Sequence, residues 1–181
     1  QGRALLDSLK LRGKPLPPIS IPCSGVLHPD ELEFAAGTFS FLDGCWQMNG
    51  TIPFADFVSQ AQFSMEDLPL ARLSEWLEMP SPLEGLSAAE GTVRIPLRDP
   101  GLLTVSGRWR ADHLKIPPVA ADSAEGLIRL EEGLLKMEDF HLQQGSGTAR
   151  GEIQLALAKP LHVQGTVQTH GWPIPWQERD I

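Results

Sequence analysis

The chain has 181 residues, of which 41% are hydrophobic, and its formal net charge is −8. This apolar share is enough for a folded core, so an intrinsically disordered chain is excluded. The acidic balance, without Lys and Arg clusters interleaved with aromatic residues, argues against nucleic-acid binding, and no apolar run approaches the roughly 20 residues of a membrane-spanning helix.

The first part of the chain predicts strands. Residues 1–18 fit a short helix and an edge strand equally well. From residue 19 on, apolar and polar residues alternate with the period of two that is typical of half-buried strands. We predict strands over residues 19–28, 32–42, 45–54 and 57–66. In the second of these strands the apolar residues switch from even-numbered to odd-numbered positions at Gly37, which predicts a β-bulge.

A hairpin turn is predicted between the second and third strands. The dipeptide Asp43-Gly44 tolerates the positive φ angles of a two-residue turn. With these two residues as the loop, Phe41 would face Trp46. Phe39 would then face Met48, and one side of the hairpin would be apolar and aromatic while the other is polar.

The period changes after the fourth strand. The spacing of Leu70, Leu73 and Leu77 predicts a helix over residues 68–77, with Asp67 as its N-cap. We expect these leucines to pack against the apolar face of the strands. After the helix, alternation predicts six further strands, over residues 91–98, 102–110, 124–130, 134–142, 148–157 and 161–169.

The two halves of the chain are related. Residues 140–155 align without a gap on residues 39–54, and the parity slip at Gly37 recurs between Met137 and Phe140. We therefore assign copy one of a β repeat to residues 1–80 and copy two to residues 81–181, stacked continuously as part of a larger chain. The alignment puts Gly147 and Ala149 where copy one has Trp46 and Met48, so a channel through both copies should be wider in copy two or partly closed by Trp46 in copy one.

The predicted fold class is all-β: a long antiparallel meander with one apolar face and one short helix at the repeat junction. The apolar face can be covered in two ways. The sheet can close on itself as a sandwich or barrel, or it can stay open as a gutter that holds an apolar guest. The spacing of the aromatic residues alone favours the closed core.

Residues with chemical function form no catalytic pattern. The five histidines do not stand at metal-ligand spacing, and the glycines punctuate hairpins rather than a phosphate loop. We expect no enzyme activity, no catalytic residue, no metal and no cofactor. Cys23 and Cys45 should be free thiols, because the strand 32–42 separates their strands by roughly 10 Å.

A family resemblance appears in the second copy. Residues 91–95, 103–116 and 126–135, the phrase around Gly145 and Gly151, and residues 160–167 resemble the repeats of the AsmA-like superfamily, the TamB- and YdbH-type proteins of Gram-negative envelopes. The resemblance covers most of residues 16–176. It implies a taco-like half-pipe with an apolar lumen, and so reverses the preference for a closed core.

The resemblance also implies a function and a location. Such chains are anchored in the inner membrane, extend across the periplasm and carry phospholipids towards the outer membrane, with an outer-membrane protein or lipoprotein as a partner at one end. The alternatives are an assembly module that acts on outer-membrane proteins by β-strand augmentation, and a structural spacer. The residues expected to line a lipid groove are Phe34, Phe39, Phe41, Trp46, Met48, Ile52, Phe54, Phe63, Val93, Ile95, Val105, Trp109, Leu135, Met137, Phe140, Leu142, Ile153, Leu155, Val163 and Val167.

Overall fold

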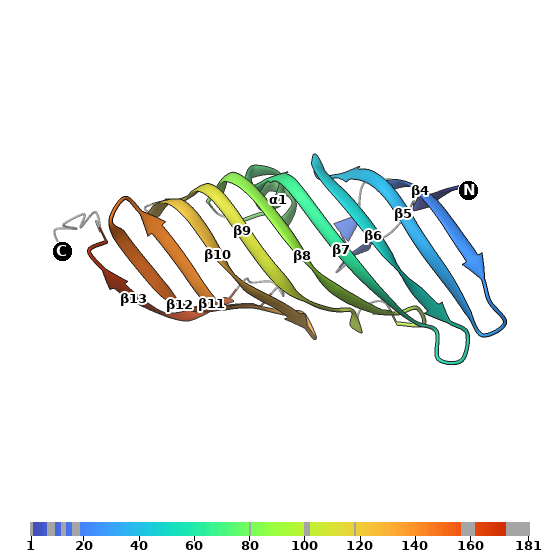
Figure 1. Ribbon diagram of the computed structural model, residues 1–181. Helices are drawn as coiled ribbons and strands as arrows, with labels where there is room; N and C mark the ends of the chain where they lie inside the picture. The colour runs from blue at the N-terminus through green and yellow to red at the C-terminus, as the bar shows by residue number, and fades with distance from the viewer. Residues whose placement is uncertain are drawn as a thin grey trace.

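The strands form one curled sheet. The computed structural model describes residues 2–6, 10–11, 14–15, 19–79, 81–99, 102–117, 119–156 and 162–172. Ten strands, from β4 to β13, pair with their chain neighbours as an antiparallel meander, and β1 adds at the free edge of β4 to give an eleven-stranded sheet. Figure 1 shows these strands side by side in one elongated, curled row, with β4 and β13 at its opposite ends. The prediction of an all-β meander curled into an open half-pipe is confirmed.

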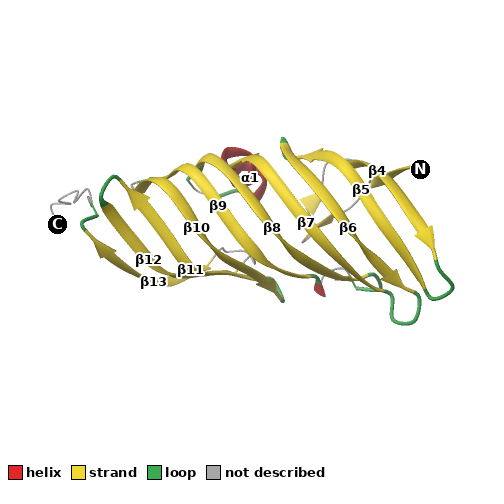
Figure 2. Cartoon of the chain, viewed as in Figure 1, coloured by secondary structure: helices red, strands yellow, loops and turns green. Residues whose placement is uncertain are grey.

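The elements have the following bounds. The large sheet contains β1 (Gly2–Leu6), β4 (Ile19–Leu27), β5 (Glu31–Phe41), β6 (Gly44–Pro53), β7 (Val58–Pro69), β8 (Glu84–Pro96), β9 (Thr104–Ile116), β10 (Val119–Glu131), β11 (Leu134–Gln144), β12 (Gly147–Ala156) and β13 (His162–His170). A separate two-stranded sheet pairs β2 (Lys10–Leu11) with β3 (Lys14–Pro15), and the helix α1 (Leu70–Leu77) follows β7. Figure 2 shows α1 as a short insertion in a molecule made almost entirely of strands.

Glycines on the apolar face allow the sheet to curl. A Cβ atom at Gly50 would collide with the carbonyl oxygen of Gln60 in the neighbouring strand. The same holds at Gly151, where the added atom would collide with the carbonyl oxygen of Thr166. The next strand therefore approaches these positions from the apolar side, and only a residue without a side chain fits there.

Both predicted β-bulges are present. The pairing of β5 with β6 shifts between Ala36 and Phe39, and the pairing of β11 with β12 shifts between Met137 and Phe140. Each bulge inserts an extra residue and strengthens the local twist, which helps to curl the sheet. The parity slips in the sequence thus predicted real features at the aligned positions of both copies.

The predicted turn of the first hairpin is wrong by one residue. The two loop residues are Leu42 and Asp43, both with positive φ (52° and 64°) as a type I′ turn requires, so Phe41 pairs with Gly44 and Phe39 pairs with Trp46. Gly44 is needed for a different reason, because a Cβ atom there would lie 3.1 Å from the Cβ of Leu68. The observed pairing differs from the predicted one by two residues, so the side chains keep their predicted faces.

The second hairpin does not repeat the first. Its turn lies at Gly145 and Ser146, two positions beyond the place that the gapless alignment implies. As a result Phe140 pairs with Gly151, whereas Phe39, which aligns with Phe140, pairs with Trp46. The alignment is correct for the bulge and wrong for the cross-strand pairs on both sides of it.

The helix begins later than predicted. It starts at Leu70 after an N-cap at Pro69, which makes no side-chain capping hydrogen bond. Asp67, the expected N-cap, instead has a φ of 53° within a bulge of β7, and the chain continues to pair with β8 as far as Pro69. Strand pairing therefore prevails over the helical spacing for residues 67–69.

Three strands are longer than predicted. β8 starts at Glu84, β9 runs to Ile116 and β10 starts at Val119, so these hairpins extend well beyond their alternating centres. The added segments contain many alanines, serines and charged residues and lack the alternation on which the prediction relied. The link between the predicted strands 91–98 and 102–110 falls partly outside the described residues.

The two cysteines lie on strands that are not neighbours. Cys23 is half-buried in β4 and Cys45 is exposed in β6, and both are free. Strand β5 lies between them, since Cys23 pairs with Ala36 and Cys45 pairs with Ser40. The strand order from which free thiols were predicted is confirmed.

Candidate functional site

The apolar face of the curled sheet is the candidate site. Three of the predicted lining residues, Phe39, Val93 and Phe140, are buried, with between 2% and 9% of their surface exposed. Three others, Phe54, Val163 and Val167, are exposed. The remaining predicted lining residues are half-buried: Phe34, Phe41, Trp46, Met48, Ile52, Phe63, Ile95, Val105, Trp109, Leu135, Met137, Leu142, Ile153 and Leu155.

This burial pattern is unusual for a chain so rich in apolar residues. Among the described residues, no large side chain has less than 2% of its surface exposed. The interior of a closed sandwich or barrel is packed as densely as an organic crystal and leaves its large central side chains fully buried. The apolar face here is sheltered by the curl of the sheet without being sealed, which is the arrangement of an open groove.

An aromatic cluster stands on this face in copy one. The Trp46 ring makes an edge contact with Phe41, at 5.9 Å between ring centroids, and a tilted contact with Phe63, at 6.3 Å. The indole nitrogen of Trp46 also donates a hydrogen bond to the carbonyl oxygen of Phe41, at 3.0 Å. These contacts hold the ring in one orientation, so this part of the groove wall is preorganised.

The junction between the copies is covered. Leu70 of α1 and Leu83 of the following segment pack on small residues of β9 and β10, and together they form the cluster of buried residues Leu70, Leu83, Ala111, Leu114, Ala121 and Ala124. Alanines at these positions leave room for the helix and its following segment. Figure 1 shows α1 beside the adjoining ends of β7 and β8, with which it is in contact.

Some predicted lining residues serve this cover instead of an open groove. Trp109 and Leu142 pack against the junction cluster, together with Leu73 of α1. Leu73 and Leu70 therefore pack as predicted, whereas Leu77 is half-buried and lies outside the cluster. Sequence spacing could not reveal the cover, because it does not say which part of the apolar face the helix reaches.

An ion pair ties the helix to the first hairpin. Arg72 Nε lies 2.7 Å from Asp43 Oδ2 in the turn between β5 and β6, and Arg72 Nη1 lies 3.2 Å from Glu75 Oε2. The hydrogen bonds to Asp43 and then to Glu75 raise the pKa of Arg72, so its charge is permanent. All three side chains are mostly exposed, so the pair orients the helix more than it stabilises the fold.

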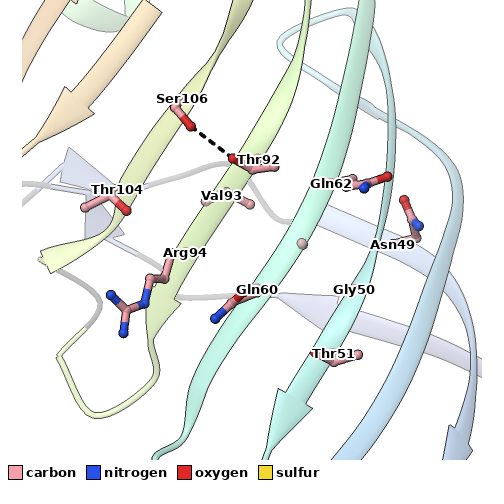
Figure 3. A pocket seen from close by; sticks show the side chains of 11 residues that line it. Asn49, Gly50, Thr51, Gln60, Gln62, Thr92, Val93, Arg94, Thr104 and Ser106 are labelled. Carbon is pink, nitrogen blue, oxygen red and sulfur yellow. Dashed lines mark hydrogen bonds between the residues drawn. The ribbon is translucent and has the colours of Figure 1, made fainter.

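The opposite face of the sheet is polar. It has a shallow depression of about 550 Å³, and the polar side chains that line it are Asn49, Thr51, Gln60, Gln62, Thr92, Arg94, Thr104 and Ser106. Figure 3 shows the hydroxyl and amide side chains spread over four neighbouring strands, with the hydroxyls of Thr92 and Ser106 3.0 Å apart in a hydrogen bond. These groups interact with water, and they leave the apolar face as the place for an apolar guest.

The ionisable residues do not converge. His28, in the connection after β4, lies 3.7 Å from Glu33 of β5, and His141 of β11 lies 3.9 Å from Glu125 of β10. In the part of the chain that the structure describes, no group of three or more His, Cys, Asp or Glu side chains is placed to hold a metal ion.

Comparison with known proteins adds no relative. No family model, curated protein or solved structure matches the chain significantly. Within the described ranges, the search for a helix long and apolar enough to cross a membrane also returns none.

Proposed function

We propose that this chain carries the acyl chains of phospholipids along its apolar groove. In this proposal it is a periplasmic segment of a longer bridge-like protein, which is anchored in the inner membrane of a Gram-negative bacterium and delivers lipid towards the outer membrane. The chain acts as a conduit, without a catalytic step or a cofactor. The open apolar face of the curled sheet is the observation that carries the proposal.

The chemistry of a phospholipid fits a half-pipe better than a closed cavity. Each CH₂ group that leaves water for an apolar surface gains about 0.8 kcal/mol, so free passage of two acyl tails through water is prohibitively slow. An open groove shelters the tails and leaves the headgroup in water. An apolar lining holds a tail without directional bonds, so a tail can slide from one strand to the next.

The arrangement of the sheet supports movement along the row of strands. The ten consecutive strands of the meander present their apolar residues side by side, so the lining continues from one strand to the next along the row. Its repeats resemble those of the AsmA-like superfamily. A lipid that passes the repeat junction must move beside the cover formed by α1 and Leu83.

Native mass spectrometry of the purified chain tests the proposal. After expression in a Gram-negative host, we expect a population with one or more bound phospholipids, released by collisional activation. The Ile153→Asp variant should carry less lipid, because a charge on the groove face opposes an acyl chain. Equal lipid occupancy in the two proteins, or none in either, would contradict the proposal.

The outer edge of β13 favours a second candidate function. All nine residues of β13 are exposed, and within the described residues the strand pairs only with β12. Such an edge can accept a further strand, either from the continuing chain or from a client protein. A site-specific photocrosslinker at Thr166 should capture a strand-forming partner if this second function operates, and capture of the chain's own continuation alone would exclude it.

A further inference from the structure

A row of apolar side chains lies along one lip of the half-pipe. They lie at or beside three successive connections, after β4, β6 and β8, at the same end of the strands, with Leu27 as the last residue of β4. The exposed fraction is 75% for Leu27, 37% for Phe54, 38% for Phe57, 42% for Leu97 and 53% for Leu102. We call these five residues the tip row. None belongs to the junction cluster, so they do not help to hold α1.

The connections are level with one another. Glu31 pairs with Pro53 and Val58 pairs with Pro96, so the strands that lead into and out of these connections end level with one another. Figure 1 shows the connections after β4 and β6 projecting side by side beyond the sheet. Successive tips are two strand spacings apart, which is about 10 Å.

This spacing matches an α-helix. Seven residues of a helix rise about 10.5 Å, so apolar residues repeated every seven positions would meet successive tips. Contact with all three tips requires about 20 Å of helix, and with one turn added at each end about 20 residues. A partner strand would need to run perpendicular to the sheet strands, where it could not pair with them.

Each tip also carries an exposed acidic residue. Asp30, Asp56 and Asp99 lie one on each connection, beside the apolar side chains. Arg98 is the neighbouring cation, and its guanidinium stacks over the Phe57 ring at 5.1 Å. The tips therefore present an apolar line flanked by negative charge, which attracts a basic partner and repels an anionic membrane surface or a second copy of the same row.

We propose that the tip row binds a basic amphipathic helix of a partner protein. The apolar stripe of that helix packs on Leu27, Phe57 and Leu97, and its flanking Lys or Arg residues lie beside the aspartates. The helix runs along the lip of the groove, so it can dock this segment on a partner without entering the groove. The three residues on which the helix packs are not among the predicted groove-lining residues, so this proposal holds whether or not the groove carries lipid.

Peptide binding tests this proposal. The probe is a fluorescein-labelled synthetic helix of 21 residues, roughly three heptads, built from Leu, Lys and Ala, with leucines on one stripe and lysines beside it. Fluorescence anisotropy with the 181-residue chain should show saturable one-to-one binding. Raised salt should weaken the binding, because the charges are exposed. A scrambled peptide of the same composition should bind at least tenfold more weakly.

Two sets of variants locate the binding. Leu27→Ser with Phe57→Ser should weaken binding at least tenfold, and Asp30→Asn with Asp99→Asn should remove most of its salt dependence. The matched control is Ile116→Ser with Val119→Ser, which changes exposed apolar residues at the opposite lip and should leave binding unchanged. Because all these side chains are exposed, circular dichroism should show the wild-type fold in every variant.

Several results would overturn the proposal. One is that the chain binds the designed and the scrambled peptide equally well. Another is that the Leu27→Ser/Phe57→Ser variant binds the designed peptide as well as the wild type does. If the wild-type chain floats with phosphatidylcholine vesicles and this double variant does not, the tip row binds a bilayer instead. If the wild-type chain dimerises in sedimentation velocity experiments and the same variant does not, the tip row binds a second copy of the chain.

Discussion

The hairpins β5–β6 and β11–β12 share a sequence phrase and a bulge but differ in their cross-strand pairs. In the first hairpin, Phe39 faces Trp46 next to the turn. In the second, Phe140 faces Gly151, and four residues on each strand separate that pair from the turn, against two in the first hairpin. The repeat therefore conserves the alternation and the bulge, while the turn decides which side chains meet.

The difference changes the wall of the groove. Copy one has the contacting rings of Phe41, Trp46 and Phe63, whereas copy two has the buried Ala149 facing Leu142. The expectation of a wider groove in copy two assumed that Gly147 and Ala149 take the places of Trp46 and Met48. In the structure Phe140 pairs with Gly151, so the facing side chains of the two copies do not correspond pair by pair. Four predictions test how each copy is held together, from the largest expected effect to the smallest.

The largest effect is expected at the glycines that both copies need. Gly50→Leu and Gly151→Leu should each destabilise the fold by about 4 kcal/mol or more, because the backbone of the next strand occupies the space for the side chain. Chemical denaturation monitored by circular dichroism measures the loss. Gly145→Ala is the control in the second turn, where the space is open and the cost is that of a positive φ, about 1 kcal/mol. Equal stability of the leucine variants and the wild type would show that the sheet is not curled at these positions.

The junction cover should be next in importance. Leu70→Asp places a charge in the buried cluster and should cost about 4 kcal/mol of unfolding free energy. Leu77→Asp changes a half-buried residue of the same helix outside the cluster, and should cost much less. Thermal melts of the two variants side by side give the comparison, and equal losses would mean that the helix packs differently.

The aromatic cluster of copy one should contribute a smaller amount. Trp46→Ala removes two ring contacts and one hydrogen bond, and should cost about 2 kcal/mol because the ring is only half-buried. Trp46→Phe keeps a ring and should recover part of the loss. Urea titration followed by circular dichroism measures both, and an unchanged midpoint for the alanine variant would mean that the ring does not support the hairpin.

The smallest effect is expected for the ion pair between the helix and the first turn. Arg72→Ala should leave the thermal midpoint nearly unchanged, since Arg72 and both carboxylates are mostly exposed. The effect should vanish entirely in high salt. A drop of many degrees would show that the pair holds α1 on the sheet.

The sequence predicted the features that depend on local alternation. The strand centres, the bulges at Gly37 and before Phe140, and the free cysteines all follow from the alternation of apolar and polar residues and from the strand order. The pairing error of two residues in the first hairpin leaves its side chains on the predicted faces, because only a shift by an odd number of residues turns a strand over.

The failures concern choices that local patterns leave open. Asp43-Gly44 is a favourable turn dipeptide, yet Gly44 is used for close approach to Leu68 and the turn moves to Leu42. Asp67 is a favourable N-cap, yet it lies in a bulge while pairing with β8 continues. In both places long-range contacts outweigh a local preference, and no single segment of sequence contains that information.

The most direct test of the open groove pairs melting curves with lipid crosslinking in Ile153→Asp and Phe41→Arg. A charge in a closed core should unfold the domain, whereas a charge in an open groove can reach water and leaves the sheet intact. Circular dichroism melts report the fold, and photoactivatable phospholipids report occupancy of the groove. An open groove predicts a retained fold with lost crosslinking in both variants. Loss of the folded state in both would contradict the open groove, and a retained fold with undiminished crosslinking would contradict the assignment of its lining.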